Sequence, residues 1–114
     1  MSKLPIEYLK HIRDELEYIS SASKGLSKNE FLQDETLKRS FTRSIEIIGE
    51  AVKNLPINFR NSQSHIDWQS ISGMRDKLIH GYFGIDYDIV WDVVKNEAPV
   101  LKVEIEKLIQ SINK

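Results

Sequence analysis

The chain has 114 residues, of which 40% are hydrophobic and 29% charged, and its formal net charge is -1. These values are typical of one soluble globular domain, here residues 1–114, and a near-neutral chain is not a general binder of polyanions. No apolar run approaches the roughly 18 residues of a membrane span, and the N-terminus lacks a signal-peptide core. Cysteine is absent, which excludes disulfides and thiolate metal sites. We therefore expect a cytoplasmic protein without a membrane partner.

Two long amphipathic helices are predicted in the first half of the chain. The first covers residues 5–23 and ends before Gly25, because apolar residues recur there at helical spacing: Leu9, Ile12, Leu16 and Ile19. Ser27 and Glu30 form a capping-box pattern that begins a new turn. A second apolar stripe runs from residue 37 to residue 55 and ends at Pro56.

The second half is predicted to contain a polar irregular stretch over residues 56–66 and then two more helices. Asp67 can cap the third helix, whose apolar positions are Trp68, Ile71, Met74 and Leu78, and Gly81 and Gly84 can end it. The fourth helix begins near Asp86 and has a kink or break at Pro99. No segment alternates long enough to indicate a strand, so the predicted fold is an all-α, up-and-down bundle of four to five helices. Gly49 and Gly73, which lie inside helical patterns, are expected to let two helices approach closely.

The chemistry-bearing residues concentrate in the segment Arg75-Asp76-Lys77-Leu78-Ile79-His80-Gly81-Tyr82. Arginine forks onto phosphate oxygens, and histidine transfers protons near neutral pH, so Arg75 and His80 could cleave a phosphodiester without a metal. Residues five apart on a helix lie roughly 140° apart around its axis. Arg75 and His80 would then point in different directions, which predicts that a homodimer assembles the site.

Each of these residues also has a structural interpretation. Arg75 is either a phosphate ligand or a surface ion-pair partner of Asp76, Glu46 or Glu50. His80 is either a general acid or base or a capping histidine, and Asp76 either orients its neighbours or is solvated. Tyr82 is either a packing aromatic or a platform on which a base stacks.

If RNA binds, we expect it to meet the middle of the chain, residues 56–85, where Arg60, Arg75 and Lys77 lie. Lys38, Arg39 and Arg43 lie on the second predicted helix, and they are either part of an RNA surface or a solvated helix face. The three histidines are scattered, and no ligand pattern or phosphate-binding loop is present, so we expect no metal and no cofactor.

The Arg-x4-His-x-Tyr spacing resembles the signature of HEPN-domain proteins, most closely of their HepT-like branch. Flanking residues agree with this branch: Ile47-Ile48-Gly49-Glu50-Ala51, Trp68, Gly73-Met74, Gly84-Ile85-Asp86 and Val90-Trp91. The likeness covers nearly the whole chain and is strongest over residues 45–101.

The resemblance implies the toxin of a toxin–antitoxin pair, an endoribonuclease with Arg75 and His80 as catalytic residues and Asp76 in support. It implies a minimal nucleotidyltransferase antitoxin as partner, which would use ATP to transfer AMP to the Tyr82 hydroxyl. An anionic adduct two residues from His80 would repel an RNA phosphate and silence the site. The alternative is a non-catalytic subunit that binds a nucleotide or substrate for such a transferase, or a purely structural bundle.

Overall fold

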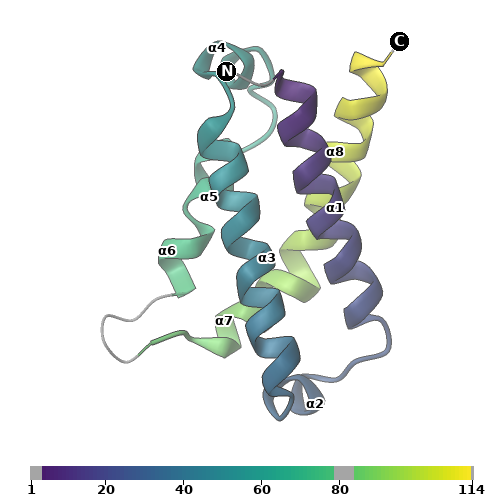
Figure 1. Ribbon diagram of the computed structural model, residues 1–114, viewed down its shortest axis with the longest axis vertical. Coiled ribbons are helices and arrows are strands. Elements are labelled where there is room, and N and C mark those ends of the chain that lie inside the picture. Colours follow the sequence, from purple (N-terminus) through teal and green to yellow (C-terminus); the bar gives the residue numbers. More distant parts are fainter. Residues whose placement is uncertain (1–3, 79–83, 114) are drawn as a thin grey trace.

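A computed structural model describes residues 4–78 and 84–113, and this part of the chain is helical. Three long helices, α1 (Pro5–Ser23), α3 (Glu35–Asn54) and α8 (Ala98–Ile112), lie side by side, with α1 packed against both others. Figure 1 shows that α1 and α3 run in opposite directions and that α8 ends beside the start of α1. The predicted all-α, up-and-down arrangement is confirmed. None of the described helices combines the length and the apolar character that crossing a bilayer requires.

Capping residues fix where α2 and α3 begin, and the sequence predicts the first of these caps. The capping box at α2 (Lys28–Leu32) forms, because the Glu30 amide donates to Ser27 Oγ at 3.1 Å and the Ser27 amide donates to Glu30 Oε1 at 2.9 Å. At α3, Asp34 Oδ1 accepts the Leu37 amide at 3.0 Å. Gly25 adopts a φ of 74°, a left-handed conformation that suits glycine where the chain turns after α1.

A stack of aromatic rings joins three elements at one end of the bundle. The Phe31 ring of α2 lies 5.6 Å from that of Phe41 on α3 and 5.3 Å from that of Trp91 on α7 (Tyr87–Asp92), measured between centroids. Phe31 and Phe41 are fully buried. Offset aromatic pairs stabilise a fold by more than the burial of their area alone. This stack therefore fastens α7, the first helix after the signature segment (residues 75–82), to the first half of the chain.

The third predicted helix is in fact two short ones, α5 (Trp68–Ser72) and α6 (Met74–Leu78). Asp67 caps α5 as predicted, accepting the Ser70 amide at 3.1 Å and the Ser70 hydroxyl at 2.8 Å. Gly73 ends α5, and a Cβ there would meet the carbonyl of Gln69 in its own preceding turn. The expectation that Gly73 serves close packing between helices is therefore wrong. Gly49 does lie where two helices meet, but an added Cβ there would be 3.4 Å from the Ser72 carbonyl oxygen, which is an ordinary contact distance.

The prediction of an irregular segment over residues 56–66 is wrong for its first half, which forms α4 (Ile57–Ser62). No residue of α4 is buried, so the helix has no apolar stripe that a sequence pattern would reveal. A side chain from α5 stabilises the C-terminal end of α4, because Trp68 Nε1 donates to the carbonyl of the C-cap residue Gln63 at 3.1 Å.

The fourth predicted helix begins at Asp86, which caps α7 by accepting the amides of Asp88 and Ile89. The predicted distortion at Pro99 lies just before it, as a π-helical turn η2 (Val93–Glu97), and Pro99 itself sits in the first turn of α8. Proline has no amide to donate to the carbonyl four residues earlier, and its ring crowds that carbonyl. The wider turn relieves the conflict, and the Ala98 amide bonds to the Val93 carbonyl five residues back.

Candidate active site

Of the three residues in the Arg-x4-His-x-Tyr signature, Arg75 is the one that the structure describes. It lies in α6, and its Nε is 3.6 Å from Oε2 of Glu46 on α3, with 42% of the Arg75 side chain and 33% of the Glu46 side chain exposed. Of the three ion-pair partners considered from the sequence, Glu46 is the one that contacts Arg75. The printed contact is at Nε, and neither terminal guanidinium nitrogen forms a hydrogen bond with another described residue. An arginine held in this way can offer its fork to a phosphate.

The close approach of two helices brings Arg75 and Glu46 together. Gly49 lies three residues after Glu46 on the same helix, and the Ser72 carbonyl faces it. Ser72 ends α5, and Arg75 follows three residues later at the start of α6. Gly49 therefore marks the place where the element carrying Arg75 passes over the element carrying Glu46.

His80, Gly81 and Tyr82 lie outside the described residues, so their predicted roles stay predictions. The described residues on either side of this segment are joined by a backbone hydrogen bond, in which the Asp86 amide donates to the Leu78 carbonyl at 2.7 Å. Gly84, with a φ of 89°, adopts the left-handed conformation expected of a terminating glycine. The predicted angle of roughly 140° between Arg75 and His80 requires a continuous helix, whereas α6 is described only to Leu78.

The neighbouring charged residues divide into packed and solvated groups. Asp76 is exposed and forms no ion pair among residues 4–78 and 84–113. Lys38 is only 15% exposed, since it pairs with Glu35 at 3.0 Å and lies 4.6 Å from the centre of the Tyr87 ring. Arg39 and Arg43 are exposed on the outer side of α3. Thus Lys38 helps to dock α7, while Arg39 and Arg43 form no ion pair with another described residue.

The described residues contain no group of three or more histidine, aspartate or glutamate side chains placed to hold a metal ion. The sequence offers Glu46 as one of several possible partners of Arg75. It gives no sign of the Lys38–Tyr87 contact, because a cation over a ring leaves no periodic pattern.

The chain is similar to a family of ribonucleases and to several of its members. Residues 12–108 match the family model described as "Ribonuclease HepT-like". "Putative RNase TTE0752" of Caldanaerobacter subterraneus is 48% identical over 108 residues, which cover 95% of this chain and 96% of that protein. "Probable ribonuclease HepT" of Thermococcus cleftensis is 40% identical, covering 90% and 93%, and "Putative RNase MJ0127" of Methanocaldococcus jannaschii is 42% identical, covering 92% and 87%.

No solved structure matches the chain significantly. The family model covers residues 12–108, which include α3 with Glu46, the whole signature segment and most of α8. The relatives align over nearly their full lengths at 40% identity or more. The chain belongs to the HepT-like ribonuclease family of HEPN proteins.

Proposed function

We propose that the protein is a metal-independent endoribonuclease and acts as the toxin of a toxin–antitoxin pair. The observation that carries this proposal is the half-exposed Arg75 guanidinium, whose Nε lies 3.6 Å from Glu46 Oε2 and whose terminal nitrogens form no hydrogen bond with another described residue. It stands five residues before a histidine, in a chain of the HepT-like ribonuclease family. Arg39 and Arg43, exposed on the same helix as Glu46, would support the flanking RNA backbone.

In this mechanism the RNA supplies its own nucleophile. The 2′-oxygen attacks the adjacent phosphorus, and the bond from phosphorus to the 5′-oxygen breaks, leaving a 2′,3′-cyclic phosphate and a 5′-hydroxyl. His80 takes the proton from the 2′-hydroxyl, and a proton returns to the leaving 5′-oxygen. Arg75 stabilises the extra negative charge of the five-coordinate phosphorus. Asp76, exposed beside Arg75, would support the orientation of the pair.

Cleavage is expected to require the 2′-hydroxyl and to continue in EDTA. An RNA with a single 2′-deoxy substitution at the cut site should resist, because the nucleophile is gone, while the same substitution elsewhere should have no effect. Gel electrophoresis and mass spectrometry of the fragments would detect the cyclic phosphate. If EDTA stops cleavage, a metal-assisted mechanism must replace this one. Binding of nucleotide without cleavage would instead support a non-catalytic subunit.

Glu46→Gln is expected to lower kcat several-fold without raising KM for RNA. The substitution keeps the side-chain shape but removes the charge that orients Arg75, and it also removes a carboxylate near the phosphate site. The thermal unfolding temperature should change little, because exposed ion pairs contribute about 0.2–1 kcal/mol or less.

Glu50→Gln is the matched control for this variant. Glu50 lies one turn further along α3, is exposed, and forms no ion pair among the described residues. The substitution removes the same charge and should leave kcat unchanged. An equal loss of kcat in both variants would show that charge on α3, and not the contact with Arg75, is responsible.

We propose that the active form is a homodimer in which two copies of Arg75 and His80 line one cleft. With two histidines, one can remove the 2′-hydroxyl proton while the other protonates the leaving oxygen. A two-fold interface is self-complementary and should bury roughly 800 Å² or more on each partner. Light scattering should give about twice the chain mass of 13.3 kDa. A monomer at micromolar concentration, active in cleavage, would contradict the shared cleft.

The regulatory partner in this proposal is a minimal nucleotidyltransferase that acts as antitoxin. The Tyr82 hydroxyl would attack the α-phosphorus of ATP and release pyrophosphate, so that tyrosine carries AMP through a phosphodiester. The added negative charge beside the site would then repel the RNA backbone.

A further inference from the structure

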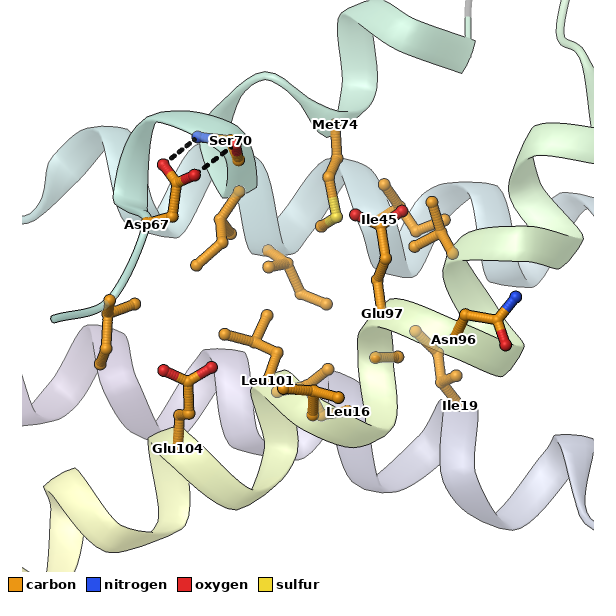
Figure 2. A pocket seen from close by; sticks show the side chains of 16 residues that line it. Leu16, Ile19, Ile45, Asp67, Ser70, Met74, Asn96, Glu97, Leu101 and Glu104 are labelled. Carbon is orange, nitrogen blue, oxygen red and sulfur yellow. Dashed lines mark hydrogen bonds between the residues drawn. The ribbon is translucent and has the colours of Figure 1, made fainter.

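An open groove lies on the face of the bundle that carries α5. Its volume is about 340 Å³, near the lower end of the range for ligand pockets. Figure 2 shows Asp67 and Ser70 on one side of it, and Asn96, Glu97, Leu101 and Glu104 on the other. Apolar side chains of α1 and α3, including Leu16, Ile19 and Ile45, form the floor.

Packing explains why the groove is open. α5 packs on α3, whereas α8 packs on α1, and the space between α5 and α8 remains uncovered. The π-helical turn η2 contributes Asn96 and Glu97 to one wall. In Figure 2 the Glu97 side chain extends across the opening towards Met74. Since π-turns in helices frequently occur at functional sites, the shape of this wall is a second indication of a binding surface.

The ionisable side chains that line the groove are all acidic. The lining residues include the carboxylates of Asp67, Glu97 and Glu104 and no lysine or arginine. Two hydrogen bonds from Ser70 hold the pKa of Asp67 below its ordinary value, so this carboxyl stays ionised. Glu97 and Glu104 form no ion pair or side-chain hydrogen bond among the described residues. A groove of this kind repels phosphates and favours a cation lying over an apolar surface.

The apolar surface continues outside the groove along α8. Val100, which lines the groove, is 61% exposed, and Val103 on the next turn is 51% exposed. Valines exposed beside a groove enlarge the apolar area that a partner can cover. Glu97 and Glu104 are seven residues apart, about 10.5 Å along a helix, or two turns.

We propose that this groove binds an amphipathic helix of a protein partner that is not a second copy of this chain. The partner helix would place apolar side chains in the groove and a lysine or arginine at two positions seven residues apart. These two cations would then face Glu97 and Glu104 with matching spacing, in the manner of a helix bound in an apolar groove. The proposal does not depend on the ribonuclease mechanism.

A pair of synthetic peptides tests the proposal on the full chain. Both are capped, helix-forming 15-residue sequences with two leucines on one face, and they differ only in carrying lysine or glutamate at the two positions seven apart. We expect the lysine peptide to bind about tenfold more tightly by fluorescence anisotropy, because like charges repel across an interface. Its binding should shift amide resonances of α5, η2 and α8 in NMR spectra.

Charge reversal provides the decisive variant. In the double substitution Glu97→Lys with Glu104→Lys the preference should reverse in favour of the glutamate peptide, a gain that an unfolded protein would not show. Asp14→Lys with Glu50→Lys changes the net charge equally, on exposed residues of α1 and α3 outside the groove, and should keep the original preference.

Three results would overturn the proposal. The first is equal affinity for the two peptides or binding to neither, and the second is resonance shifts outside the groove. The third is loss of self-association in the Glu97→Lys, Glu104→Lys variant, which would identify a second copy as the occupant. All readouts are binding or assembly, so a failure of the ribonuclease assay leaves this test intact.

Discussion

Arg75→Ala and His80→Ala are expected to abolish most RNA cleavage while leaving the fold intact. Removal of a preorganised donor to a developing negative charge costs roughly 10²–10³-fold in rate, and removal of a general acid or base costs roughly 10²–10⁴-fold. Arg75 is 42% exposed and contacts Glu46 through one nitrogen, so its loss should change the unfolding temperature little. Initial rates on a defined RNA, with circular dichroism to confirm folding, measure both quantities.

Arg75→Lys separates the charge of Arg75 from its geometry. Lysine keeps the positive charge but lacks the planar fork, so we expect only partial rescue of the rate. Asp76→Asn serves as the control for the segment, and it should cause a smaller loss because Asp76 is exposed and would only support the pair. Full activity of Arg75→Ala would remove Arg75 from the mechanism, and a loss in Asp76→Asn as large as in Arg75→Ala would make Asp76 a principal residue.

Tyr82→Phe is expected to keep most ribonuclease activity and to escape silencing by the partner transferase. The substitution removes the hydroxyl that would accept AMP and retains the ring for packing or stacking. Arg75→Ala and His80→Ala should show the opposite pattern, with cleavage lost and Tyr82 still modified. Intact-mass spectrometry after incubation with the transferase and ATP measures the modification, as additions of the mass of one AMP group.

Two outcomes would change the assignment of Tyr82. Equal labelling of Tyr82→Phe and the wild-type protein would place the acceptor on another residue. An unlabelled Tyr82→Phe that is also inactive would place the hydroxyl in the catalytic site itself. The control is the purified protein incubated with the transferase without ATP. Any loss of ribonuclease activity in this control is due to binding of the transferase and not to AMP transfer.

The long elements could be predicted because each depends on a pattern that extends over several turns. The stripe of Leu9, Ile12, Leu16 and Ile19 buries one face of α1, and the caps at Ser27, Asp67 and Asp86 form local hydrogen bonds that neighbouring residues determine. The signature segment could be identified because its spacing is local as well.

The short elements could not be predicted, for physical reasons that differ between them. α4 buries none of its residues, so it lacks periodicity. The division between α5 and α6 at Gly73 depends on how the chain passes over α3, where Gly49 meets the Ser72 carbonyl. The groove depends on the spacing between α5 and α8, and the choice of Glu46 over Glu50 depends on the position of α6 along α3. These are tertiary relations that a single sequence does not encode in its spacing.

The π-turn before Pro99 also determines how this family can tolerate changes of length. A π-turn is equivalent to an α-helix that holds one additional residue, and the helices on both sides keep their faces towards the core. Deletion of one residue within 93–97 would convert the turn to ordinary helix and leave α8 in register. The same deletion in the middle of α8 would rotate everything after it by about 100° and turn Leu108 and Ile109 out of the core. Insertions and deletions among relatives should therefore concentrate at η2, where they would reshape the groove wall without disturbing the bundle.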